Sequence, residues 1–163
     1  MLSKDGIPTE EDLAKVMPSE ERLLSGPVAI AECFQEIPCN PCSKACVKNA
    51  IRVEPDINAC PVVDFGTCNG CAACVQRCPG LAIFVVDMTY SETTALVKLP
   101  YEDLPLPKPG DQVQCLSRAG EAVGIFPVEK VIGSPKNKTY VVSVEVPKEL
   151  AMTVRNIRAG GIY

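Results

Sequence analysis

The chain has 163 residues, of which 47% are apolar and 22% are charged, and its formal net charge is −4. This composition is typical of a globular protein of one or two small domains, and not of a disordered chain. The absence of histidine excludes His-dependent catalytic triads, His-ligated zinc, Rieske centres and His-ligated haem. The acidic balance, the absence of tryptophan and an aromatic content of 5% argue against a nucleic-acid-binding surface.

The sequence lacks the apolar segments of a membrane or exported protein. Its longest unbroken apolar run, Leu81 to Val86, is far shorter than the roughly 20 residues of a membrane helix. The first six residues have neither the apolar centre nor the small-residue cleavage site of a secretory signal. We therefore expect a cytoplasmic protein with no membrane span. In that reducing compartment, ten cysteines indicate metal binding more than disulfides.

Residues 1–32 form a cysteine-free lead-in. Thr9 is suited to cap a short helix whose first turn is acidic, and Pro18-Ser19 begins a second short helix that Gly26-Pro27 ends. Residues 28–31 are apolar enough to form a strand. We expect this segment to be a strap packed on the rest of the protein, with a partner-binding arm as the alternative.

The next region, residues 33–88, contains an internal repeat with an offset of 32 residues. Such a repeat predicts two copies of one small unit that face each other across a pseudo-twofold axis. Each unit would be a cysteine loop, a short helix and a strand. The repeated residues are Cys39, Cys42, Cys46 and Ala50-Ile51, which recur as Cys71, Cys74, Cys78 and Ala82-Ile83.

The cysteine spacing indicates iron–sulfur clusters. In the bacterial ferredoxin run, three close cysteines hold one [4Fe–4S] cluster and the fourth ligates the other cluster. A zinc ribbon would leave surplus thiols, and cysteines this close in sequence are poorly placed for disulfides. The second run has the full ferredoxin spacing, and the first is irregular, with C-x5-C-x2-C-x3-C. We assign Cys33, Cys39, Cys42 and Cys78 to cluster 1, and Cys68, Cys71, Cys74 and Cys46 to cluster 2.

Two cysteines exceed the eight ligands. Cys60 is the rival of Cys33 for the last place in cluster 1, and Cys115 lies far along the chain. For each surplus cysteine the simplest interpretation is a small buried apolar side chain, with a redox or alternative-ligand role as the other possibility. Because few charged or aromatic residues lie near the runs, we expect backbone hydrogen bonds and burial to tune the clusters.

Residues 89–163 are predicted to be β-rich. The expected strands are 94–99, 112–116, 122–131 and 139–146, enough for a small barrel. Pro147 suits the first turn of a C-terminal helix with an apolar stripe of Leu150, Val154 and Ile157. Arg155 and Arg158 would then lie on a solvated helix face, with an anionic partner as the alternative.

Residues 33–88 resemble a bacterial-type two-[4Fe–4S] ferredoxin domain, on the cysteines above and on the Ala-Ile pair after each run. The resemblance implies one-electron transfer at low potential. The expected fold class is α+β, with a ferredoxin-like two-cluster (βαβ)2 domain followed by a small β-barrel-like domain that ends in a helix. We find no nucleophile with a base beside it, so we expect no catalytic residue in this chain.

The stretch from Glu32 to Cys42, together with the barrel-like C-terminal part, is similar to small iron–sulfur subunits of FAD-dependent amino-acid or amine dehydrogenases of the proline, hydroxyproline or sarcosine type. This resemblance implies a hetero-oligomer with larger flavoprotein subunits that carry the FAD or FMN. The chain would then relay electrons as a non-catalytic subunit. The alternatives are a stand-alone soluble ferredoxin-like carrier and a protein that uses cluster occupancy as a regulatory or assembly signal.

Overall fold

A computed structural model describes residues 2–160 of the chain. The lead-in contains three short helices, α1 (Leu2–Asp5), α2 (Glu10–Ala14) and α3 (Glu20–Leu23). The Thr9 cap is confirmed, because its side chain and that of Asp12 form a reciprocal capping box. Ser19 likewise caps α3 by accepting a hydrogen bond from the backbone N–H of Arg22. Helix α1 was not expected from the sequence.

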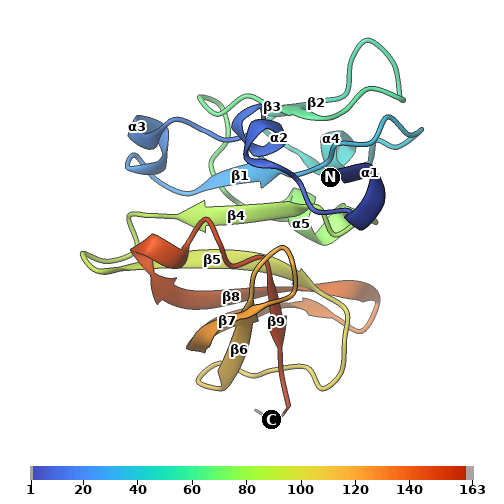
Figure 1. Cartoon of the computed structure of the whole chain (residues 1–163). Coiled ribbons are helices and arrows are strands. Elements are labelled where there is room, and N and C mark those ends of the chain that lie inside the picture. Colours follow the sequence, from blue (N-terminus) through green and yellow to red (C-terminus); the bar gives the residue numbers. More distant parts are fainter. Residues whose placement is uncertain (1, 161–163) are drawn as a thin grey trace.

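The internal repeat appears in the structure as two crossed β-α-β units. The first unit is β1 (Val28–Ala31), α4 (Pro41–Ala45) and β2 (Ile51–Arg52), and the second is β3 (Val62–Val63), α5 (Ala73–Arg77) and β4 (Ile83–Asp87). The first strand of each unit pairs with the second strand of the other, so that β1 pairs with β4 and β3 pairs with β2. This exchange joins the two units into one body at the top of Figure 1.

The repeat extends to the pairing register and to the backbone angles. Ala31 lies opposite Ile83 in one pair of strands, and Val63 lies opposite Ile51 in the other. Val63 and Ile83 of the second unit each lie 32 residues after their counterparts in the first unit, Ala31 and Ile51. Asn49 and Leu81, which are related in the same way, adopt the uncommon left-handed backbone with φ of 54° and 51°. The two units therefore share one local conformation.

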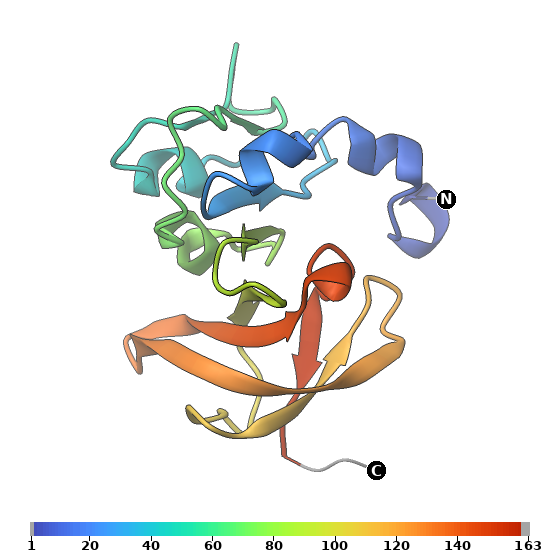
Figure 2. The same cartoon turned by 90° about the vertical axis from the view of Figure 1, so that its left-hand side faces the viewer.

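A seven-stranded antiparallel sheet connects these units to the C-terminal part. Its strand order is β1-β4-β5-β8-β7-β6-β9. The C-terminal strands curl (Figure 2), and β9 contacts β5. Bulges interrupt the pairing of β6 with β7 and of β7 with β8. The four strands expected after residue 89 are confirmed, at β5 (Thr94–Tyr101), β6 (Gln112–Leu116), β7 (Ala122–Ser134) and β8 (Asn137–Pro147).

The strands β1 and β4 separate two apolar cores. All four residues of β1 and the first four of β4 are buried. On one face, Ile30 and Phe84 join the core of the curled sheet. On the other, Ala29 and Val85 pack against the helices that carry the cysteines. The expected boundary between residues 88 and 89 falls between β4 and β5, which are hydrogen-bonded neighbours in this sheet.

The expected C-terminal helix is wrong. Only Lys148–Leu150 form a single 3₁₀ turn, and the chain then enters β9 (Asn156–Arg158), which pairs with β6. The apolar positions Val154 and Ile157 are buried as expected, but in a turn and a strand. The free edge of β6 offers hydrogen bonds to an extended chain, and the β-branched residues here favour helix only weakly. Tertiary pairing therefore decides the conformation.

Candidate iron–sulfur centre

The eight predicted ligands line two separate cavities in the crossed units. Each cavity is lined by four cysteines, in the combinations expected from the sequence. The first is lined by Cys33, Cys39, Cys42 and Cys78, and the second by Cys46, Cys68, Cys71 and Cys74. We call these the first and the second cysteine cavity. Each receives three cysteines from its own side of the repeat and one from the other.

The short helices α4 and α5 explain this exchange. Cys42 lies within α4 and faces the first cavity, whereas Cys46 caps the C-terminal end of the same helix and faces the second. Cys74 within α5 and Cys78 at its end repeat the arrangement with the cavities reversed. Residues four apart in a helix lie about 6 Å apart along its axis, so one turn separates the two sulfurs of each helix. Each helix thus reaches both cavities.

Backbone N–H groups donate hydrogen bonds to three of the sulfurs. The N–H of Ala50 lies 3.3 Å from Sγ of Cys46, and that of Ala82 lies 3.5 Å from Sγ of Cys78. These two contacts are related by the repeat. Sγ of Cys68 accepts from the N–H groups of Ala29 and Gly70, each at 3.4 Å. Such donors stabilise negative charge on sulfur.

The cavities are unfavourable places for thiolates without a compensating cation. Burial, and then the neighbouring Cys68 and Cys71, raise the pKa of Cys74 to about 12. Burial is also the main cause of the raised pKa values of Cys33 and Cys42, and other thiols of the first cavity contribute to both. A bound metal ion reverses this balance, because coordination deprotonates a thiol outright. The donor set therefore suits a cationic iron–sulfur core.

The number of thiols around each cavity suits a cluster. A four-iron cluster takes one cysteine at each iron, and four cysteines line each cavity. Across residues 2–160, no three or more His, Cys, Asp or Glu side chains form a group that could hold a single metal ion.

The two surplus cysteines lie outside both cysteine cavities. Cys60 lines a neighbouring cavity of about 390 Å³ beneath the lead-in, on which Cys33 also opens. The first cavity is lined by Ala59 and Pro61 on either side of Cys60, and by Cys33 itself. Cys115 is fully buried in β6, where burial raises the pKa of its thiol to about 12. Its environment is that of a small apolar side chain.

Arg22 fixes the loop that leads into the second cavity, a role that the sequence analysis missed. Its Nε donates to the carbonyl of Phe65 at 2.5 Å, and its Nη2 donates to that of Cys68 at 2.8 Å. Further bonds reach the carbonyls of Gly26 and Pro27 at 3.0 Å each. The lead-in is therefore tied to the cysteine loop by one guanidinium. Its only sequence signal was an arginine in the last turn of a short helix.

A buried ion cluster joins the first unit to the curled sheet. Arg118 donates to both carboxylate oxygens of Glu32, at 2.8 and 2.6 Å, and Nε of Arg155 donates to Oε1 at 2.7 Å. The expected solvated helix face is thus wrong for Arg155, which is 6% exposed, whereas Arg158 is exposed. Burial alone would raise the pKa of Glu32, but the hydrogen bonds and charges of both arginines hold it below its ordinary value. Glu32 directly precedes Cys33.

Comparisons with known proteins agree with the cysteine pattern. The chain is 45% identical over 61 residues to the ferredoxin-type protein NapF of Haemophilus influenzae, a match that covers 36% of this chain and 35% of that protein. The chain thus spans about a third of the length of this relative. No protein-family model and no solved structure matches the chain. No helix among residues 2–160 has the length and apolar character needed to cross a bilayer. Over the matched residues the chain is thus similar to a ferredoxin-type protein.

Proposed function

We propose that the chain carries electrons through two [4Fe–4S] clusters, one in each cysteine cavity. The observation that carries this proposal is the pair of four-cysteine cavities, each completed by a residue of the other repeat. The clusters would supply the one-electron chemistry. The chain's own residues hold them with eight thiolates, bury them between helices and sheet, and direct N–H groups at the sulfurs.

The ligand assignment is tested by a pair of cysteine variants. Cys33→Ala removes a thiol from the first cavity and should lose cluster 1 while cluster 2 stays. Cys60→Ala is the matched control, because Cys60 lies close to Cys33 but does not line that cavity. Iron and sulfide per chain, measured after anaerobic purification, distinguish the two variants. Full iron content in Cys33→Ala, or loss of half the iron in Cys60→Ala, would overturn the assignment.

The chain is further proposed to act as a non-catalytic subunit of a flavoprotein dehydrogenase for amino acids or amines. A free carrier needs only the crossed units, yet here a strap of three helices and a curled sheet are added to them. Apolar side chains are exposed beside both cavities, with Val47 84% exposed next to Cys46 and Ile37 48% exposed in the wall of the first cavity. Exposed apolar residues near redox centres suit docking to a partner.

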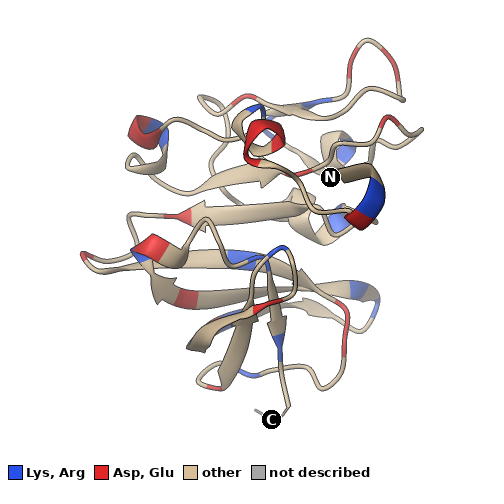
Figure 3. Cartoon of the chain, viewed as in Figure 1, with Lys and Arg blue, Asp and Glu red and all other residues tan. Residues whose placement is uncertain are grey.

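Charge would assist this docking. Acidic residues occupy the lead-in helices and the loop between β2 and β3, where Glu54 and Asp56 are exposed (Figure 3). Eight thiolates and two oxidised cluster cores would make the loaded chain more negative than its formal −4. An acidic carrier is attracted to basic docking faces, and this attraction weakens as salt screens it.

Anaerobic purification of the native protein under mild conditions tests this proposal. A larger flavoprotein in fixed stoichiometry is expected, with the FAD or FMN on that partner and the iron on this chain. Amino-acid and amine substrates should then reduce the clusters and bleach their visible absorbance. A lone brown monomer without flavin would refute the subunit proposal and favour the stand-alone carrier.

A further inference from the structure

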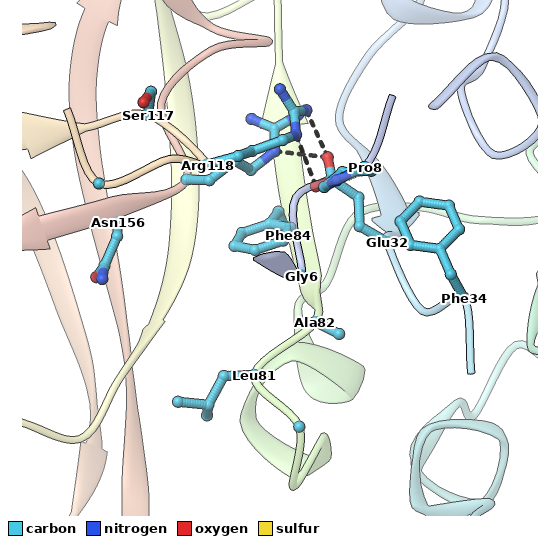
Figure 4. A pocket seen from close by; sticks show the side chains of 13 residues that line it. Gly6, Pro8, Glu32, Phe34, Leu81, Ala82, Phe84, Ser117, Arg118 and Asn156 are labelled. Carbon is cyan, nitrogen blue, oxygen red and sulfur yellow. Dashed lines mark hydrogen bonds and ion pairs between the residues drawn. The ribbon is translucent and has the colours of Figure 1, made fainter. Parts of the chain in front are cut away.

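A cavity of about 330 Å³ lies between the lead-in, the crossed β-α-β units and the curled sheet (Figure 4). Glu32 and Phe34 approach it from the segment after β1, and Phe84 from β4. Arg118 from the β6–β7 loop and Arg155 from the segment before β9 line the opposite side. The volume is at the lower end of the range for small-molecule sites. We call this space the arginine cavity.

The arginine cavity contains more positive than negative charge. Two guanidinium groups face the single carboxylate of Glu32, and the three side chains are only 17%, 3% and 7% exposed for Arg118, Arg155 and Glu32. Within residues 2–160, Nη2 of Arg155 is buried without a hydrogen-bond partner. Its Nε and Nη1 are used by Glu32 and by the carbonyls of Ala151 and Val154. The guanidinium of Arg155 also lies over the ring of Phe84, 5.1 Å from its centroid. A buried donor without a partner is costly, and an anion that draws this guanidinium toward the cavity would supply one.

The walls indicate what kind of anion fits. Net charge in the cavity is about +1 if both arginines and Glu32 are ionised, which matches a monoanion better than a phosphate dianion. Nε and Nη2 of Arg118 already bind Glu32, so a carboxylate ligand would accept hydrogen bonds from Nη1 of Arg118 and Nη2 of Arg155. Phe34, Leu81 and Pro8 add apolar surface beside the charged groups. We infer that the arginine cavity binds a small monocarboxylate with an apolar or aromatic body.

This site would lie next to the first cysteine cavity. Glu32 and Phe34 flank Cys33, and the segment Gly80–Ala82, which lines the arginine cavity, directly follows Cys78. The inference does not depend on electron transfer or on a flavoprotein partner. Binding is a property of the chain's own residues. The carboxylate site can therefore be absent while the proposed electron transfer holds, and it can be present while the proposed electron transfer fails.

Isothermal titration calorimetry of the anaerobically purified native protein tests the inference, with benzoate, acetate and inorganic phosphate as probes. Benzoate should bind saturably at one site per chain, acetate should bind more weakly, and phosphate should show no saturable heat. Absence of saturable benzoate binding, or phosphate binding in preference to benzoate, would overturn the inference.

Two variants with opposite expected effects locate the site. Arg118→Gln removes one positive charge and should weaken benzoate binding at least about tenfold, the effect expected for one lost hydrogen bond to a charged group. Glu32→Gln removes the internal carboxylate that competes with the ligand and should strengthen binding, a gain that misfolding cannot produce. Lys138→Gln is the control, because Lys138 is exposed and lines a different cavity. Iron content verifies that each variant keeps its clusters. Unchanged affinity in both Arg118→Gln and Glu32→Gln would overturn the inference.

Discussion

Gly70 lies in the loop of the second cysteine cavity, and the structure leaves no room there for a side chain. Its backbone has φ of +69°, and an added Cβ would stand 2.5 Å from Cβ of Pro27 and 2.8 Å from the Pro27 carbonyl carbon. The positive φ costs an alanine about 1–2 kcal/mol. Overpacking against the Pro27 ring and backbone adds about 1–3 kcal/mol. We therefore expect Gly70→Ala to destabilise the protein by about 2–5 kcal/mol.

Gly120→Ala is the matched control for this prediction. Gly120 has a similar φ of +79°, but no atom lies within 4 Å of its added Cβ, so only the backbone cost of about 1–2 kcal/mol applies. The assay is the urea concentration at which the visible cluster absorbance is lost under anaerobic conditions. Gly70→Ala should lose it at lower urea than Gly120→Ala, with cluster 2 released first. Equal midpoints for the two variants would refute the packing argument.

Two further predictions concern the lead-in and the surplus thiols. Arg22→Ala breaks the hydrogen bonds to the carbonyls of Phe65 and Cys68 and should lower the free energy of unfolding by about 1.5–3 kcal/mol. The measurement is the urea midpoint of cluster loss, which should fall. An unchanged midpoint would mean that the lead-in does not hold the loop. Burial raises the pKa of Cys115 to about 12, so its thiol stays protonated and should remain unlabelled by iodoacetamide from pH 7 to 9. Burial, and then the nearby Glu36, raise the pKa of Cys60, but its side chain is only half-buried, so mass spectrometry should find slow labelling of Cys60 that increases with pH. Labelling of Cys115 in the folded protein would contradict its burial.

The cysteine spacing and the 32-residue repeat were the parts of the molecule that the sequence predicted best. Ligand spacing is a local property, because the three close cysteines of a run fall on one loop and one helical turn. The fourth cysteine of each cavity comes from the other repeat, as the pattern of the bacterial ferredoxin run predicted. The β-rich strands were equally predictable, since residues 94–146 alternate in polarity and are divided by turn residues.

The errors arose where distant segments decide the conformation. An apolar stripe at Val154 and Ile157 fits a helix and also fits a turn followed by a strand. Residues 156–158 pair with the free edge of β6, and their partners in β6 lie 40 or more positions earlier in the chain. This pairing selects the strand. The wrong expectation for Arg155 has the same cause, because its partner Glu32 lies 123 residues away in the sequence. Pairings over such separations leave no periodic pattern in the sequence.

The measurement that tests the central claim most directly is iron and acid-labile sulfide per chain, with electron paramagnetic resonance of the reduced protein. It should compare the native protein with Cys46→Ala and Cys78→Ala, prepared without oxygen. We predict about eight irons and eight sulfides in the native chain, from two four-iron clusters. Because the helices exchange ligands, Cys46→Ala should lose cluster 2 and keep cluster 1, and Cys78→Ala should do the reverse. A native chain with zinc in place of iron, or variants that each lose the cluster of their own repeat, would contradict the account.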